Sequence, residues 1–327
     1  MTDARGTDGT GTTADTEGTD GTGSTADSRG RGGTGGTSGP GGWEFTDDRG
    51  TALTAARRPE RVVAYVRAGA ALLDLGVRPV AVYGSGHDAD VLDPVKASGL
   101  VAEGVPYLGP GRTLERNLTE ARTRDLGGVD LIVDVTYDGK SPYAVDEALA
   151  ERLGVPLVAL SVGNELPLAA IVDRFGALAG ALGATGVPGV PGGNAGRLGD
   201  AEAAVRAAAG RTGVSVLALS GAGPEQVHLA RPHAWPELAR LAELGVRFVD
   251  PGPGPGASWL TTDWEHAVGL GPDLVLFDSR TNAVPPHAVP AGARLAPWNP
   301  ETPPSPAAFA RFFQDLAAAL EDEGREA

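Results

Sequence analysis

The segment LGGVDLIVDVTYD, residues 126–138, decides the fold, because a second segment much later in the chain repeats its design. In LGPDLVLFDSR, residues 270–280, a glycine-containing turn again leads to an aspartate, a short apolar run and an abrupt change to polar residues. A continuous apolar run bounded by turns is typical of a strand buried in a parallel sheet. The two segments therefore predict matching strands in two similar halves of the chain.

The sequence around each segment alternates between strand and helix patterns. The first half predicts strands at 61–66, 78–84, 130–135 and 156–162, with helices at 68–76 and 141–154; Ser141 and Pro142 stand where the second helix would begin. The later half predicts strands at 214–220, 246–250, 273–279 and 293–298 between helices at 200–210, 230–245, 261–271 and 305–323. This alternation predicts an α/β fold with two Rossmann-like lobes, each built on a parallel sheet.

One longer helix is predicted between the halves. From Pro167 to Gly183, apolar residues recur at helical spacing: Leu168, Ile171, Val172, Phe175, Leu178 and Leu182. We therefore expect an N-terminal lobe over 43–163, an inter-lobe helix over 164–183 and a C-terminal lobe over 184–327. The lobe at 43–163 should open with a hairpin around Asp48–Gly50.

Residues 1–42 form a low-complexity tail. The twelve residues at 6–17 are nearly repeated at 18–29, and almost none is apolar. Such a segment cannot bury enough surface to offset its backbone entropy, so we expect the tail to be disordered.

Composition excludes several classes of function. The formal net charge is -15, and no basic cluster is present to neutralise phosphates, which disfavours nucleic-acid binding. There is no cysteine, so disulfides and thiolate sites are excluded. No apolar run approaches the ~18 residues of a membrane helix, and no secretory signal is visible in the sequence as given.

Catalytic and metal-binding patterns are also absent. The sequence holds no Gly-x-Ser-x-Gly, no phosphate-binding loop ending in Lys-Ser/Thr and no His-Glu-x-x-His. The five histidines include no pair four residues apart, so we expect no metal site. These absences favour a binding protein over an enzyme.

Residues at the predicted strand ends suggest what is bound. In open α/β sheets, ligands gather beyond the carboxyl ends of the strands, and two lobes would direct both sets of ends into one cleft. The side chains expected there supply flat apolar faces and directed charges. The candidates are Arg67, Tyr83, Tyr137, Trp259, Arg280 and Trp298.

Three segments resemble the iron-siderophore substrate-binding proteins of ABC importers, a family that includes cobalamin and haem binders. Residues 45–65, FTDDRGTALTAARRPERVVAY, are similar to that family's opening hairpin, Arg-Pro-x-Arg-Val-Val segment and first strand. Residues 261–279, TTDWEHAVGLGPDLVLFDS, resemble its C-terminal Ser-Leu-Glu…Leu-x-Pro-Asp-Leu-Ile motif, and residues 116–135 are a looser counterpart. The resemblance implies two lobes joined by a rigid helix.

The resemblance also implies a ligand and its contacts. The ligand would be a ferric siderophore, most simply a hydroxamate chelate, with iron entering only inside the chelate and no other cofactor. Tyr137 and Trp298 fall where hydroxamate-binding members contact the chelate. Arg67 or Arg280 would donate to the hydroxamate oxygens.

The resemblance bears less directly on the permease partner and on the cellular location. The family docks to its permease through a surface glutamate on each lobe; Glu265 matches one, while the other position holds Thr119 between Glu115 and Glu120. Without a visible signal or lipid-attachment cysteine, we expect a cytoplasmic monomer, or a cell-surface lipoprotein if the true start lies upstream. Two rival functions remain: an intracellular relative that binds another small molecule without permease docking, and an enzyme on the same scaffold.

Overall fold

The computed structural model describes residues 42–124, 126–163, 166–185, 194–286 and 292–322. The tail expected over 1–42 therefore lies outside the described residues, apart from Gly42. In the described part of the chain, no helix combines the length and the apolar character needed to cross a membrane.

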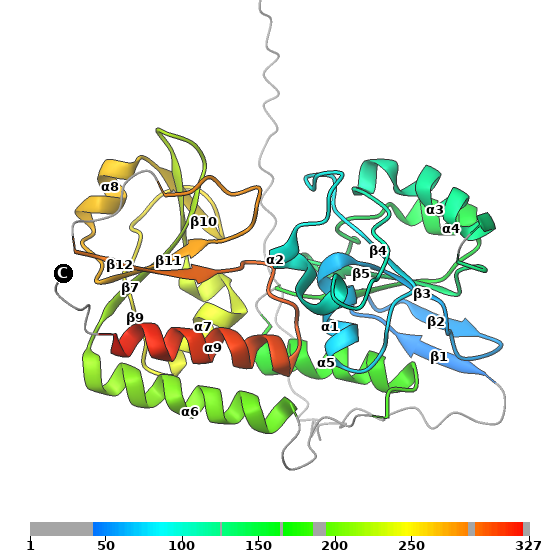
Figure 1. Ribbon diagram of the computed structural model, residues 1–327, viewed down its shortest axis with the longest axis horizontal. Coiled ribbons are helices and arrows are strands. Elements are labelled where there is room, and N and C mark those ends of the chain that lie inside the picture. The colour runs from blue at the N-terminus through cyan, green and yellow to red at the C-terminus, as the bar shows by residue number, and fades with distance from the viewer. Residues whose placement is uncertain (1–41, 125, 164–165, 186–193, 287–291, 323–327) are drawn as a thin grey trace, which may run out of the picture. The chain divides into compact units, whose positions relative to one another are not determined.

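The first sheet is wholly parallel and has the order β4-β3-β5-β6 (Figure 1). Its strands are β3 (Val62–Tyr65), β4 (Ala81–Tyr83), β5 (Leu131–Thr136) and β6 (Leu157–Ser161), and every residue in them is buried. Strands that are buried along their whole length need cover on both faces. The hairpin β1 (Trp43–Thr46) and β2 (Ala52–Ala55) precedes the sheet. Helices α1 (Val66–Asp74), α2 (Pro94–Ala97), α3 (Leu114–Arg124) and α4 (Glu147–Leu153) complete this lobe.

Helix α4 begins later than the sequence suggests. Asp146, rather than Ser141, caps it, through its carboxylate and the amide of Ala148 at 3.0 Å. The preceding residues form a loop because their amides bond elsewhere: Asp134 accepts from the amides of Ala144 and Val145. This loop matters below because it carries two tyrosines.

The second sheet is mixed, where the sequence predicted a parallel one. Its order is β10-β8-β7-β11-β12, with β9 also paired to β7. Strand β8 is antiparallel to both of its neighbours, because the turn at 222–226 reverses the chain and the amide of Ala222 bonds to the carbonyl of Gln226 at 3.0 Å. The strands are β7 (Ser215–Gly221), β8 (Val227–Ala230), β9 (Arg247–Phe248), β10 (Trp259–Thr262), β11 (Leu274–Asp278) and β12 (Arg294–Trp298).

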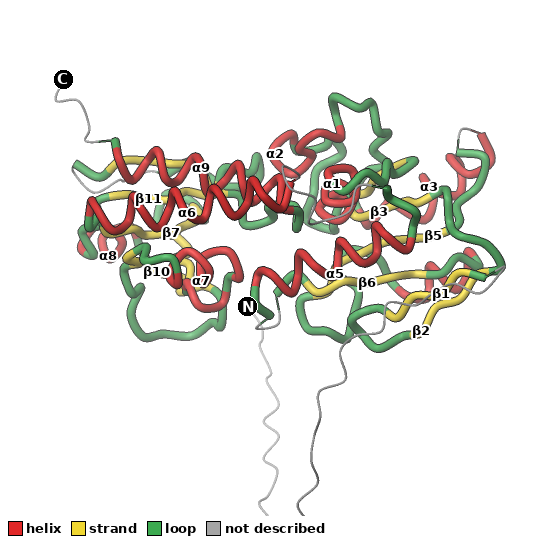
Figure 2. The backbone as a smooth tube through the Cα atoms, turned by 90° about the horizontal axis from the view of Figure 1, so that it is seen from below, coloured by secondary structure: helices red, strands yellow, loops and turns green. Residues whose placement is uncertain are grey.

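Helices of the second lobe cover this sheet. They are α6 (Asn194–Thr212), α7 (Pro236–Glu243), α8 (Trp264–Gly269) and α9 (Pro306–Glu321). Helices α6 and α9 run side by side in both views (Figures 1 and 2). Val205 from α6 and Phe309 and Phe313 from α9 are buried in the same core. The sequence predicted a single helix at 230–245. The structure instead has the last residue of β8, a short 3-10 turn at Pro232–Ala234 and then α7.

Helix α5 (Leu168–Ala181) contributes to both hydrophobic cores. Leu168 and Val172 belong to the core of the second lobe, whereas Ile171, Phe175 and Leu178 belong to that of the first. One helix thus packs against both lobes, and only residues of its first two turns reach the core of the second lobe. This is the arrangement that a rigid connection between lobes requires.

Candidate ligand-binding site

Tyrosines and an arginine gather where the strands of the first sheet end. Tyr65 is the last residue of β3, Arg67 lies in the first turn of α1, and Tyr137 follows β5. The Arg67 Nη1 donates to the Tyr137 hydroxyl at 3.0 Å. Tyr143 packs edge-on against both tyrosine rings, with centroids 4.9 Å from Tyr137 and 5.6 Å from Tyr65. Tyr137 and Tyr143 are each 38% exposed, so this end of the sheet offers aromatic surface to a ligand.

Glu301 joins these residues to the second lobe. It follows β12, is buried, and accepts hydrogen bonds from the Tyr65 hydroxyl and from Arg280 Nη1, the latter at 2.6 Å. Lys96 of the first lobe lies 3.0 Å from the same carboxylate. The carbonyl of Thr302, the next residue, accepts from Arg67 Nε at 3.1 Å. We call Tyr65, Arg67, Lys96, Tyr137, Tyr143, Arg280 and Glu301 the junction cluster.

Three tryptophans form a wall on the side of the second lobe. The Trp298 ring lies 5.3 Å from Trp235 and 5.7 Å from Trp259, and the last two are 4.8 Å apart. The Trp298 indole N–H donates to the buried carboxylate of Glu237 at 3.2 Å. We call Trp235, Trp259 and Trp298 the tryptophan wall.

A single arginine shapes the loop that leads to this wall. Arg231 donates to the carbonyls of Gly252, Gly254 and Gly256, each at 3.0 Å. All three glycines have positive φ, a conformation that residues with a side chain rarely adopt. Arg231 thereby fixes the chain immediately before Trp259.

Burial and charge set the ionisation of these groups. Burial, followed by the charge of Glu301, raises the pKa of Tyr65 well above its usual value, so its hydroxyl stays a donor. Burial likewise raises the pKa of Glu237, while the charge of Arg67 opposes that rise. Burial disfavours the Arg67 charge, but Tyr137, Glu237 and Glu301 raise its pKa overall, so Arg67 remains a cation.

Five of the six predicted ligand residues lie in or beside this region. Arg67, Tyr137 and Arg280 are in the junction cluster, and Trp259 and Trp298 are in the tryptophan wall. Tyr83 is not with them: it is fully buried in the core of the first lobe, where its hydroxyl donates to the carbonyl of Val133 at 3.3 Å.

Sequence reasoning missed several members of the site. The missed residues are Lys96, Tyr143, Trp235, Glu237 and Glu301. Two of them could have been found from the sequence. Glu301 is a charged residue three positions past a tryptophan at a predicted strand end, and Lys96 is one of only two lysines in the chain. Glu237 could not, since an acidic residue in a helical first turn is ordinary.

The predicted docking glutamates lie on surface helices. Glu115 and Glu120 are exposed on α3, and Glu265 is exposed in the first turn of α8. Glu115 makes a two-point pair with Arg152, at 3.1 and 3.0 Å, which partly neutralises its charge.

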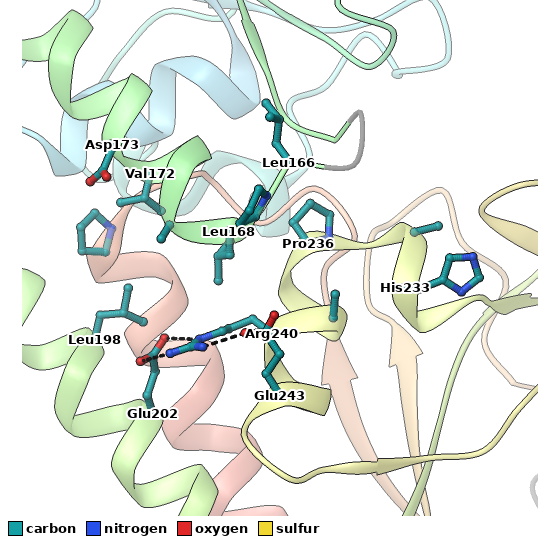
Figure 3. A pocket seen from close by; sticks show the side chains of 15 residues that line it. Leu166, Leu168, Val172, Asp173, Leu198, Glu202, His233, Pro236, Arg240 and Glu243 are labelled. Atoms are coloured by element: carbon teal, nitrogen blue, oxygen red, sulfur yellow. Dashed lines mark hydrogen bonds and ion pairs between the residues drawn. The ribbon is translucent and has the colours of Figure 1, made fainter. Parts of the chain in front are cut away.

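A separate cavity of about 680 Å³ lies between α5, α6 and α7 (Figure 3). Leu168 and Val172 form part of its apolar wall, and Arg240 is paired there with Glu202 and Glu243. Its volume suits a small molecule. However, it contains none of the predicted ligand residues, and its arginine is already neutralised. We therefore favour the junction cluster as the recognition site.

In the described residues, no three histidine or acidic side chains gather as a metal site.

Comparisons with known proteins agree with the fold. No family model and no curated protein matches the chain. Among solved structures, DesE, a ferric-siderophore receptor protein from Streptomyces coelicolor, is 25% identical with a TM-score of 0.74, covering 86% of this chain and 98% of its own. The siderophore periplasmic binding protein from the fuscachelin gene cluster of Thermobifida fusca is 15% identical, with a TM-score of 0.55 and coverage of 80% and 96%. The periplasmic haem-binding protein RhuT from Roseiflexus sp. RS-1 is 19% identical, with a TM-score of 0.56 and coverage of 80% and 98%.

These likenesses correct one expectation. The chain was expected to be cytoplasmic, yet the solved structures that share its fold include periplasmic binding proteins. The cytoplasmic expectation is therefore wrong.

Fold and likeness agree on one class of molecule. The chain has two sheets and a helix shared by both hydrophobic cores, and the solved structures of similar fold are described as receptor or binding proteins. The chain has the fold of the siderophore- and haem-binding periplasmic proteins that it resembles.

Proposed function

We propose that the protein captures a ferric siderophore of the hydroxamate type between its two lobes and delivers it to an ABC importer. The observation that carries this proposal is Arg67, a buried cation that bonds to the partly exposed Tyr137. Hydroxamate oxygens bound to iron keep partial negative charge, and a guanidinium fork suits such oxygens.

The surrounding aromatic residues fit the rest of such a ligand. A linear or cyclic hydroxamate chelate carries apolar linkers between its iron-binding groups, and tyrosine and tryptophan rings bury such linkers while their polar ends stay bonded. Tyr137 and Tyr143 supply one surface, and the partly exposed Trp259 supplies the other. Trp298 is only 1% exposed and packs behind Trp259. The chelate fills the iron coordination sphere, so the protein needs no metal ligand of its own and no other cofactor, and it acts as a monomer.

The similarity of DesE, a ferric-siderophore receptor protein, supports this choice of ligand. Delivery to a permease would use Glu265 on one lobe and Glu115 or Glu120 on the other, each exposed. Because Glu115 is paired with Arg152, docking through it would exchange one arginine partner for another.

The test is a titration of tryptophan fluorescence with a ferric tris-hydroxamate. The wild-type protein should show saturable quenching at submicromolar concentration, since Trp259 and Trp298 lie at the proposed site. Arg67→Ala and Tyr137→Ala should weaken binding by about tenfold or more, because each removes a directed contact. Arg240→Ala, which alters the separate cavity, is the matched control and should bind like wild type. If Arg240→Ala abolished binding and Arg67→Ala did not, the site assignment would be wrong.

A further inference from the structure

Two of the three cations in the junction cluster are already fully paired. Lys96 lies 2.6 Å from Asp88 and 3.0 Å from Glu301. Arg280 lies 2.6 Å from Asp278 and 2.6 Å from Glu301. Because each ammonium or guanidinium is shared by two carboxylates, neither has positive charge left to offer an anionic ligand.

Arg67 is different, since it bonds only to neutral partners, the Tyr137 hydroxyl and the Thr302 carbonyl. Across the described ranges it makes no ion pair. Its charge is felt by Glu237, a carboxylate that is only 1% exposed, accepts from the Trp298 indole, and also forms no ion pair with any described residue. The region therefore holds one unpaired guanidinium and one unpaired buried carboxylate.

The balance of charge in this region is negative. The carboxylates of Asp88, Glu237, Asp278 and Glu301 outnumber the cations Arg67, Lys96 and Arg280. A buried charge without a partner is costly, and like charges a few ångströms apart repel by more than a kilocalorie per mole in a protein interior. Arg67 is the one cation of the cluster without a carboxylate partner, and the charge of the nearby buried Glu237 offsets it, so a ligand that brings its own negative charge finds no net positive charge here.

We propose that Glu237 and Glu301 make this site select neutral and cationic ferric chelates and reject anionic ones. Glu237 repels the added charge directly. Glu301 acts by holding Lys96 and Arg280, so that neither turns toward the ligand. The inference rests on the proposed capture of a ferric chelate and adds the property by which chelates are chosen.

The experiment uses three linear ferric tris-hydroxamates that differ only at one terminal amine, which is free and cationic, acetylated and neutral, or succinylated and anionic. The iron-binding groups are the same in all three, so only the outer charge varies. Wild-type protein should bind the cationic and neutral chelates alike and the anionic chelate at least about tenfold more weakly. Equal affinity for all three would overturn the inference and leave the proposed function standing. Failure to bind any of them would instead overturn the proposed function.

Charge-neutral variants identify the residues responsible. Glu237→Gln keeps the side-chain shape and the carbonyl that accepts from Trp298. This variant should bind the anionic chelate at least about threefold more tightly than wild type does. Glu301→Gln should do the same, because it leaves Lys96 and Arg280 with one carboxylate partner each instead of two. It tests the proposal independently if Glu237→Gln does not fold. The matched control is Glu225→Gln, an exposed site with the same change of charge. If Glu237→Gln and Glu301→Gln both rejected the anionic chelate as strongly as wild type does, the assignment to these two carboxylates would be wrong.

Discussion

Asp134 illustrates how one buried side chain shapes the site without touching a ligand. It lies in the middle of β5 with no exposed surface, and its carboxylate accepts from the amides of Val135, Ala144 and Val145 at 2.7 to 3.0 Å. These bonds fix the loop that runs from Tyr137 past Tyr143. Burial raises the pKa of Asp134 to about 7, although the three amides oppose the rise.

This raised pKa predicts a pH dependence of stability. In the unfolded chain the Asp134 pKa returns to about 3.9. Because folding favours the protonated form, the stability that Asp134 contributes is fully present below about pH 4 and is lost as pH rises through about 7. Wild-type protein should therefore lose stability relative to Asp134→Asn between pH 5 and pH 8, as measured by urea unfolding.

Asp130 on the same stretch of chain provides the control. Its pKa is lowered by hydrogen bonds from the amides of Glu60 and Arg61 and by the Arg61 guanidinium, against the opposing effect of partial burial. Its stabilising contribution is therefore lost only as pH falls below the unfolded value near 4. The stability difference between wild type and Asp130→Asn should stay constant from pH 5 to pH 8. A constant difference for Asp134→Asn as well would contradict the assigned pKa.

The sequence locates side chains at strand ends, because strand ends are visible in the pattern of apolar runs, but it does not show how deeply each side chain is buried. Tyr137 and the two arginines lie beside one another at the ends of strands, and their role in binding stays a prediction. Tyr83 and Trp298 also end strands, yet both are buried in a core. Glu237 reaches the site from a helix, so no strand pattern could reveal it.

At the scale of elements, the loop at 251–258 shows how one arginine can hold a segment without regular secondary structure in a single conformation. Six of these eight residues are glycine or proline, so the segment has a low propensity for both strand and helix. The three bonds from Arg231, together with one from the Trp235 indole to the Ser258 carbonyl at 3.1 Å, hold it against the tryptophan wall.

We therefore expect Arg231→Ala to loosen this loop without unfolding the protein. Amide hydrogen exchange at Gly254 and Gly256 should accelerate by about tenfold, because local opening no longer breaks the guanidinium bonds. Ligand affinity should fall with it, since Trp259 follows the loop directly. Arg206→Ala, at an exposed position on α6, is the control. Unchanged exchange in Arg231→Ala would show that the glycines and prolines hold the loop unaided.

Element prediction was accurate for buried parallel strands and for α5, whose patterns are long and regular. It failed at α4, where Asp134 captures amides that the helix would otherwise use, and at β8 and β10, where antiparallel strands of four residues give no distinct pattern. Both failures have one cause: distant partners, not local sequence, decided the conformation.

At the scale of the whole molecule, the net charge of -15 acts on a ligand before contact. A field of this sign attracts cations over roughly a Debye length, about 10 Å at 0.1 M salt. The association rate of the cationic chelate should therefore fall several-fold between 20 mM and 500 mM salt in stopped-flow quenching. The neutral chelate supplies the control and should associate at a nearly constant rate. An equal salt response for both would mean that long-range charge plays no part.

The two-lobe architecture followed from the sequence, because the repeated strand pattern and the helix between its copies are properties of the chain itself. Location did not follow, since the fold relationship, rather than the visible sequence, overturned the cytoplasmic expectation. The exact chelate is also a property of side chains brought together from both lobes, which no local pattern records.

The central claim is that the protein recognises an iron-loaded hydroxamate chelate. Isothermal titration calorimetry with a neutral linear tris-hydroxamate, in its ferric form and iron-free, tests it most directly. We predict one-to-one binding of the ferric form at submicromolar Kd, with the iron-free form at least about tenfold weaker, because only iron holds the hydroxamate oxygens in a compact, preorganised array. Absence of heat with the ferric chelate, or equal affinity for both forms, would contradict the claim.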